Sequence, residues 1–121
     1  MGTRLQMNAM IEEAYQAAMK SGKYDSVKRW GVPGQHRHYA CTNHWEYFAE
    51  MSEAFWSSAR FRGDYEPFTR AELVEFDPQG GRVCELVWGV SVEEVDARTG
   101  EQNRTDQRVS VEEVPQCCCM S

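Results

Sequence analysis

The glutamates that follow His44 are the first residues of this chain whose spacing suggests chemistry. Glu46, Glu50 and Glu53 stand at i, i+4 and i+7, which places them on one face of a helix, and Ser57 at i+11 continues the row. Like charges one turn apart destabilise an isolated helix by roughly a few tenths of a kcal/mol. A bound cation would offset that repulsion, because carboxylate oxygens are metal ligands.

The same row has an explanation that needs no metal. Asn43 is a favourable N-cap residue, and Glu46 at the third helical position can reach back to the Asn43 N–H in a capping box. Acidic residues in a first turn also suit the helix dipole, and Glu50 and Glu53 would then form a solvated face. Spacing alone favours this explanation over a metal site.

Histidines close to these glutamates add a weak second signal. His36, His38 and His44 lie within nine residues, and the first two share a side if their segment is extended. They could form a small metal site, but no cysteine stands at ligand spacing beside them. Exposed histidines in a loop are the favoured interpretation.

The elements that must position these side chains are predicted to be mainly α-helical. A first helix is indicated by apolar residues at helical spacing, followed by Gly22 as a stop signal. Residues 23–35 are predicted to be a connector with turns at Gly31, Pro33 and Gly34. The residues that indicate the first helix are Met7, Met10, Ile11, Ala14, Ala17 and Ala18.

A second helix is predicted from Asn43 to about Ala59, and two shorter ones follow it. Thr69 and Glu72 form a capping box for the third, and the pair Asp77-Pro78 opens the fourth. The stripe of the second helix that is predicted to face the core consists of Trp45, Ala49, Ser52, Phe55, Trp56 and Ala59.

The totals limit the classes of function. A chain of 121 residues with 41% hydrophobic residues is long enough for one domain with a real core. The net charge of −6 argues against nucleic acid as a partner, since that needs clustered Lys and Arg. No apolar run reaches the length of a transmembrane segment and no signal peptide is recognisable, so the cytoplasm is the default location.

Composition changes near Gly89, which predicts a domain over residues 1–89 and an acidic, flexible tail over residues 90–121. The tail holds seven acidic and three basic residues and no aromatic residue. It repeats VSVEEV at residues 90–95 and 109–114, and pairing of these copies as a β-hairpin is the alternative to a flexible tail.

The last four residues, Cys118-Cys119-Met120-Ser121, fit the C-a-a-X pattern for farnesylation of Cys118. A palmitoyl chain on Cys117 would supply the second signal that stable membrane anchoring needs. The preceding segment is acidic and would be repelled by anionic lipids, so a chance terminus is the favoured interpretation.

The stretch YACTNHWEYFAE also matches a longer pattern, in which Tyr is followed after three residues by Asn, after two more by Glu, and then by an aromatic pair and Ala-Glu. The pattern resembles the zinc-ligand helix of metallopeptidases related to the catalytic domain of anthrax lethal factor. Similar stretches are AYQAAMKSGKYDSV, YEPFTRAELVEFDP and VWG, so the resemblance covers about residues 7–89. The matching positions are Tyr39, Asn43, Glu46, Tyr47, Phe48, Ala49 and Glu50.

The resemblance implies the C-terminal helical part of a zincin-like domain that hydrolyses peptide or protein substrates with zinc. Glu46 would be the downstream zinc ligand, and Asn43 would cap its helix and fix where it points. Tyr39 would stabilise the oxyanion or protonate the leaving amine. Glu50 would orient a ligating histidine.

One departure from the family pattern decides what to expect of activity. Such enzymes bind zinc through two histidines of an HExxH helix, and this sequence contains no HExxH. We therefore expect no tight zinc binding and no peptidase activity from the chain alone. The alternative is a non-enzymatic remnant that acts as a binding or membrane-tethered adaptor module.

A missing HExxH helix would also leave apolar surface of the Glu46 helix uncovered, which predicts self-association. Exposed Trp30, Trp45 or Trp56 could form a partner surface, although core packing is the favoured use of each.

Overall fold

The computed structural model describes residues 3–58 and 64–99. Within them the chain is mainly α-helical, as predicted, with one short two-stranded sheet. The helices of the first unit are α1 Arg4–Ser21, α2 His44–Phe55, α3 Arg70–Phe76 and α4 Pro78–Trp88, with a 3₁₀ turn η1 Tyr39–Cys41 before α2.

Helix α1 begins and ends on local signals. Thr3 and Gln6 form a reciprocal capping box at its start. Gly22 closes it in the left-handed conformation with φ of 75°, which confirms the predicted stop. Its buried residues are Ile11, Ala14 and Ala18, and these three belong to the predicted apolar stripe.

The other predicted helix starts are also confirmed. Thr69 caps α3 by accepting the Glu72 N–H, and Asp77 caps α4 with Pro78 at the first helical position. Helix α2 starts at its Asn43 cap but ends at Phe55, four residues before the predicted end.

The connector over residues 23–35 contains regular structure that was not predicted. Strands β1 Val27–Arg29 and β2 Val32–His36 pair antiparallel, with Arg29 opposite Val32 across a two-residue turn. Gly31 has φ of 73°, which such a turn requires. The turn signal was therefore right, and the strands on either side of it were missed.

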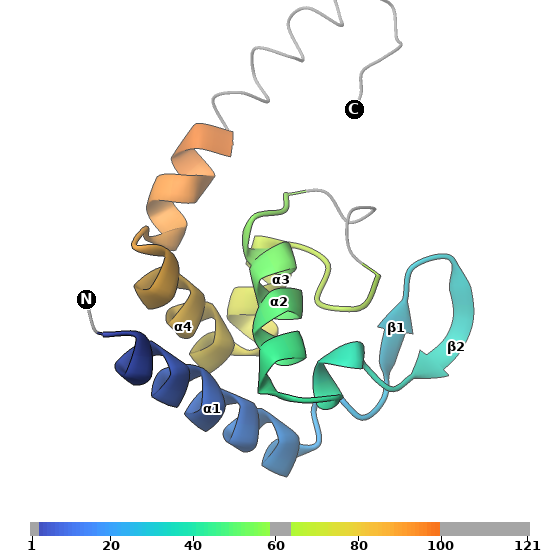
Figure 1. Ribbon diagram of the computed structural model, residues 1–121. Coiled ribbons are helices and arrows are strands. Elements are labelled where there is room, and N and C mark those ends of the chain that lie inside the picture. Colours follow the sequence, from blue (N-terminus) through green and yellow to red (C-terminus); the bar gives the residue numbers. More distant parts are fainter. Residues whose placement is uncertain (1–2, 59–63, 100–121) are drawn as a thin grey trace, which may run out of the picture. The chain divides into compact units, whose positions relative to one another are not determined.

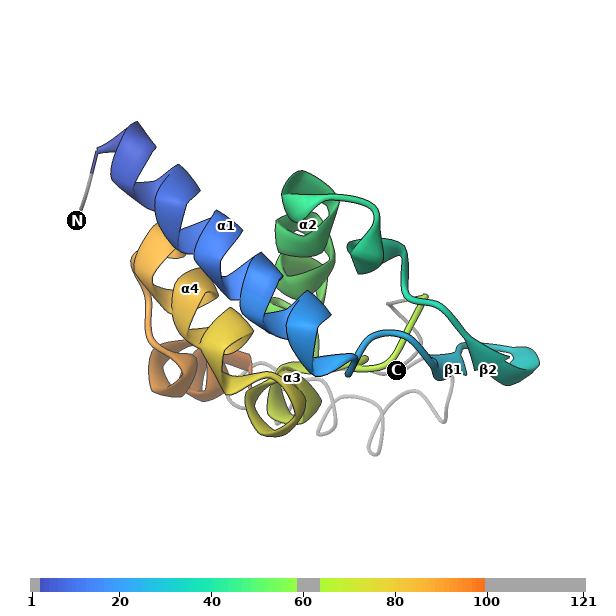
Figure 2. The same cartoon turned by 90° about the horizontal axis from the view of Figure 1, so that it is seen from below.

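Helices α1, α2 and α4 lie against one another, with α3 packed on α2 and α4 (Figure 1, Figure 2). Their shared core is built around large side chains with at most 1% exposure. These are Tyr24, Tyr47, Met51, Phe55 and Leu73.

The predicted core face of α2 is only partly right. Ser52 and Phe55 are buried as predicted, and Ala59 lies outside the described residues. Trp45 and Trp56 are 52% and 45% exposed, and Ala49 is exposed as well. Besides Ser52 and Phe55, the core side of the helix consists of Tyr47, Met51 and Ala54, which were not predicted. A helical pattern with apolar residues on most sides does not define which side the neighbouring helices cover.

The chain divides into two compact units, Met1–Val90 and Ser91–Ser121. In the second unit, residues 92–99 form a helix in which Ser91 and Glu94 make reciprocal capping bonds. The first copy of VSVEEV thus lies at a helix start, which differs from the hairpin alternative and, for residues 92–99, from the predicted flexible tail. The second copy lies outside the described residues. Among residues 3–58 and 64–99, no helix is both long and apolar enough to cross a bilayer.

Candidate functional site

The residues implied by the metallopeptidase resemblance lie at the start of α2. Asn43 Oδ1 accepts the Glu46 N–H at 2.8 Å, so the cap is formed as predicted. The return bond from the Asn43 N–H to the Glu46 carboxylate is absent from this described turn, which leaves that carboxylate free of the cap. Tyr39 opens η1, which contacts α2, and its side chain is 48% exposed.

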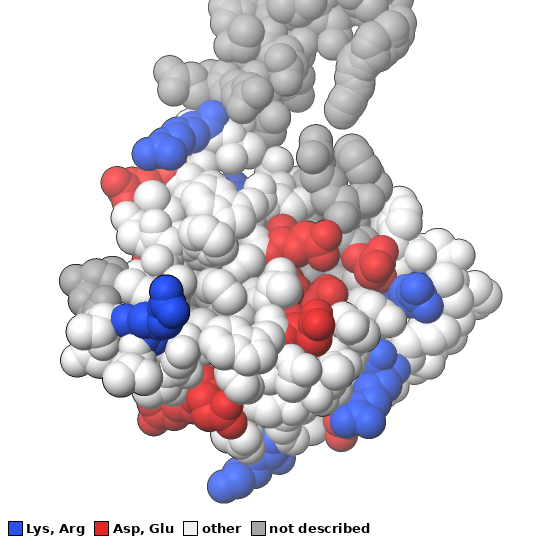
Figure 3. All heavy atoms as spheres, viewed as in Figure 1, with Lys and Arg blue, Asp and Glu red and all other residues white. Residues whose placement is uncertain are grey.

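Glu46, Glu50, Glu53 and Asp64 form what we call the acidic stripe, which gathers over α2 (Figure 3). Partial burial and repulsion from Glu53, Asp64 and Glu46 raise the pKa of Glu50 to about 7. Partial burial and Asp64 also raise the pKa of Glu53. No basic side chain in the described parts of the chain forms an ion pair with the stripe.

The described residues do not fit a zinc ion. They contain no group of three or more His, Cys, Asp or Glu side chains that could hold a metal. The histidines are engaged elsewhere: His44 Nδ1 lies 3.0 Å from Glu12, and His36 Nε2 lies 3.1 Å from the Pro33 carbonyl oxygen. Zinc needs three or four protein ligands that converge on one point, and the carboxylates of the stripe do not form such a group.

The prediction that His38 is an exposed loop histidine is wrong. It is 2% exposed, and its Nδ1 accepts the Ala40 N–H at 3.0 Å. Its ring packs against Tyr24 and Tyr65 with centroid distances of 5.0 and 4.7 Å. Burial lowers its pKa to about 4, so at neutral pH it is an uncharged core residue.

A buried carboxylate that the sequence identified only as a helix cap lies on the other side of α2. Asp77 is 2% exposed, and its Oδ2 accepts the hydroxyl protons of Tyr47 at 2.7 Å and Tyr24 at 2.8 Å. Its Oδ1 accepts the Gly80 N–H at 2.9 Å. Burial and the neighbouring carboxylate raise the pKa values of both phenols, so they stay protonated as donors.

The surroundings of Asp77 are closely packed. A Cβ on Gly80 would lie 2.6 Å from Asp77 Oδ2 and 2.7 Å from the Tyr47 hydroxyl. Cys84 is fully buried nearby, and burial raises the pKa of its thiol to about 12, which makes it a poor nucleophile. With no access for substrate, this cluster holds the helices together.

An exposed aromatic surface borders the acidic stripe. Trp88 of α4 packs against Phe48 of α2 and against Trp56, the residue that follows α2, with ring centroids 5.9 Å apart in each case. The Trp88 Nε1–H donates to Ser52 Oγ at 2.9 Å, which fixes the indole across α2. Trp45 lies on the same outer side of α2 near its start. We call Trp45, Phe48, Trp56 and Trp88 the aromatic ridge.

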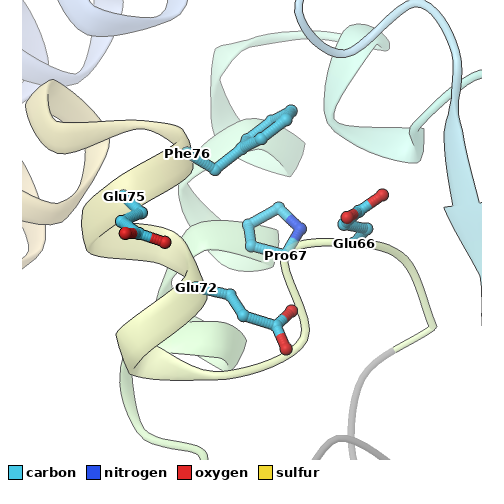
Figure 4. A pocket seen from close by; sticks show the side chains of 5 residues that line it. All are labelled: Glu66, Pro67, Glu72, Glu75 and Phe76. Atoms are coloured by element: carbon cyan, nitrogen blue, oxygen red, sulfur yellow. The ribbon is translucent and has the colours of Figure 1, made fainter.

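A separate depression of about 420 Å³ lies beside α3, lined by Glu66, Pro67, Glu72, Glu75 and Phe76 (Figure 4). Glu72 already accepts the Phe68 N–H and Glu66 the Lys28 N–H. The depression is open and contains no residue of the predicted site.

Comparisons with protein-family models, with curated proteins and with solved structures found no match to this chain. The metallopeptidase resemblance therefore remains a prediction from the sequence. Cys117 and Cys118, the predicted lipidation sites, lie outside the described residues.

Proposed function

We propose that this chain is the glutamate-bearing part of a zinc metallopeptidase-like domain and that it does not hydrolyse peptides alone. The proposal is supported by the placement of Glu46 and Glu50 one turn apart on an outward side of α2, behind the Asn43 cap. Their mutual repulsion is a feature that a cation would relieve. The other ligands would have to come from outside the described residues.

Two measurements test this proposal. Calorimetric titration of the chain with zinc is expected to show no stoichiometric, submicromolar binding, and such binding would contradict it. The second measurement is to read the genomic DNA upstream of Met1 for an in-frame HExxH motif. A chain extended to include such a motif is expected to bind zinc.

The extended protein also allows a matched comparison. Glu46→Gln should abolish its zinc binding, whereas Glu53→Gln, two turns along the same helix, should leave binding within about twofold. Equal effects of the two substitutions would refute the proposed role of Glu46 as a zinc ligand. The absence of an upstream HExxH would favour a remnant that has lost the catalytic helix over a truncated enzyme.

A second candidate function, a non-enzymatic binding module, is favoured by the aromatic ridge. Trp45, Trp56 and Trp88 are 52%, 45% and 46% exposed. Tryptophan is enriched among the residues that carry binding energy at protein interfaces, and a grouped set of exposed indoles is uncommon on a surface without a partner. Membrane tethering through Cys118 would make the module an adaptor.

The binding function is tested by selecting ridge-dependent ligands from a displayed library of helical peptides. Clones are expected to bind the chain and to lose binding to the Trp45→Ala and Trp56→Ala variants, but not to Trp30→Ala. Trp30 is 50% exposed and lies outside the ridge, so it is a matched control. An intact mass without an added prenyl group, after expression in a eukaryotic cell, would exclude the tether.

A further inference from the structure

The ridge and the stripe share the outer side of α2, and together they define a surface with two chemically different halves. At 100° per residue, Trp45, Ala49 and Trp56 fall along one line, and Glu53, Glu46 and Glu50 follow around the helix in the next sector. The opposite sector contains the buried Tyr47, Met51 and Phe55. An apolar edge and an acidic edge therefore run side by side along α2.

The length of this surface suits an α-helical partner. Trp56 follows Trp45 by eleven positions, which corresponds to roughly 16 Å along the axis of α2, or about three helical turns. Trp88 is held between these ends by its bond to Ser52. A helix with apolar residues at i, i+3 or i+4, and i+7 over three turns would cover the ridge.

The charge of the surface selects among helical partners. The ridge and stripe together contain four carboxylates and no basic residue, and the stripe makes no ion pair within the described residues. A partner with Lys or Arg along one flank would neutralise this excess, and one with acidic residues there would be repelled. A second copy of this chain or an anionic bilayer would bring further negative charge to the surface.

We propose that the ridge and stripe bind a basic amphipathic helix, whose apolar face lies on Trp45, Trp56 and Trp88 and whose Lys or Arg residues lie beside Glu46, Glu50 and Glu53. This inference rests on the second proposed function, that the ridge binds a protein, and adds the class of partner.

One selection experiment separates the two claims. The bait is the full chain, and the displayed library consists of 18-residue helical peptides with a fixed leucine face and flanks randomised equally among Lys, Glu and Ser. The expected result is enrichment of Lys on one flank, in peptides whose affinity falls about tenfold or more with Trp56→Ala and is unchanged by Trp30→Ala. Circular dichroism verifies that each variant is folded.

Charge variants then test the stripe itself. A selected Lys peptide should bind the triple variant Glu46→Gln, Glu50→Gln, Glu53→Gln about tenfold more weakly, and its affinity for the unmodified chain should fall as salt rises. Glu13→Gln on the exposed side of α1 is the matched control and should change little.

The outcomes are distinguishable. Ridge-dependent peptides with neutral or acidic flanks would overturn the partner class and leave the binding module standing. Failure to obtain any ridge-dependent peptide would overturn both. A dimer in sedimentation equilibrium that Trp56→Ala dissociates, or binding of the chain to phosphatidylcholine vesicles through the ridge, would assign the surface to another occupant and overturn the inference.

Discussion

Carboxylates lie on both sides of α2, but only the buried one is surrounded by hydrogen-bond donors. On the inner side, Tyr47 donates to Asp77, a buried carboxylate with three hydrogen-bond donors directed at it. On the outer side, Glu46, Glu50 and Glu53 lie near one another and near Asp64. No basic side chain among the described residues forms an ion pair with them. The inner carboxylate stabilises the fold because its donors are fixed in place. The outer carboxylates destabilise the fold slightly by mutual repulsion, and they remain available to bind a positively charged partner.

The largest effect is expected from removing the inner carboxylate. Asp77→Ala leaves two buried hydroxyl groups and the first turn of α4 without their acceptor, and should lower the free energy of unfolding by about 4 kcal/mol. Urea denaturation followed by circular dichroism measures this. Asp25→Ala, at an exposed aspartate, is the control and should change stability by less than about 0.5 kcal/mol. A similar loss in both variants would show that Asp77 contributes no more to stability than an exposed aspartate.

The space around the inner carboxylate can be tested with two adjacent glycines. Gly80→Ala would place a methyl group 2.6 Å from Asp77 Oδ2 and should destabilise the protein by about 2 kcal/mol. Gly81→Ala meets nothing closer than 3.9 Å and should stabilise α4 by up to about 1 kcal/mol, because alanine is the better helix former. Thermal unfolding of the two variants should shift in opposite directions. Equal shifts would show that the cluster is less tightly packed than described.

A single donor contributes less than the whole cluster. Tyr47→Phe removes one hydrogen bond to Asp77 while keeping the ring in the core, and should cost about 1 kcal/mol in urea denaturation. Tyr39→Phe, at a half-exposed hydroxyl, should be neutral within about 0.5 kcal/mol. If Tyr39→Phe were the more damaging of the two, the outer surface and not the buried cluster would contribute more to stability.

The smallest effect is expected on the outer side, and it depends on pH. The pKa of Glu50 is about 7 in the folded protein and 4.5 without the fold, so the folded state retains a proton that the unfolded state releases between these values. Stability from Glu50 is therefore present below pH 4.5 and is lost as pH rises through 7. Glu50→Gln should raise stability at pH 8 by less than about 1 kcal/mol and have little effect at pH 4.

His38 changes stability with pH in the opposite direction to Glu50, over an overlapping pH range. Its pKa falls to about 4 in the folded protein, so the unfolded state binds the extra proton and stability declines as pH falls from 6.5 to 4. The Glu50 effect is thus best measured as the difference between the variant and the unmodified chain at each pH, since the His38 contribution cancels. A pH-independent difference would contradict the assigned role of Glu50.

What the sequence predicted correctly depends on short-range signals. Asn43, Thr69 and Asp77 act on backbone groups three residues away, so their capping roles follow from local spacing. The two strands beside Gly31 were missed because they are only three and five residues long and contain few apolar side chains.

What the sequence did not predict depends on distant partners. The two phenol donors to Asp77 come from positions 30 and 53 residues earlier, and nothing near Asp77 signals them. The side of α2 that is buried is likewise set by α1 and α4, so Trp45 and Trp56 were assigned to the wrong face. The row of Glu46, Glu50 and Glu53 follows from the sequence. That no basic side chain among the described residues pairs with it could be learned only from the structure.

The exposure of the tryptophans has a spectroscopic consequence. All four indoles are between 45% and 52% exposed, so each is in contact with water before the protein unfolds. Tryptophan emission should therefore already be shifted to long wavelength in the native state and change little in wavelength on denaturation. The chiral signal of Tyr24 and Tyr47 in the near ultraviolet should disappear in the same transition, which makes the tyrosines the reporters of the core and the tryptophans the reporters of whatever covers α2.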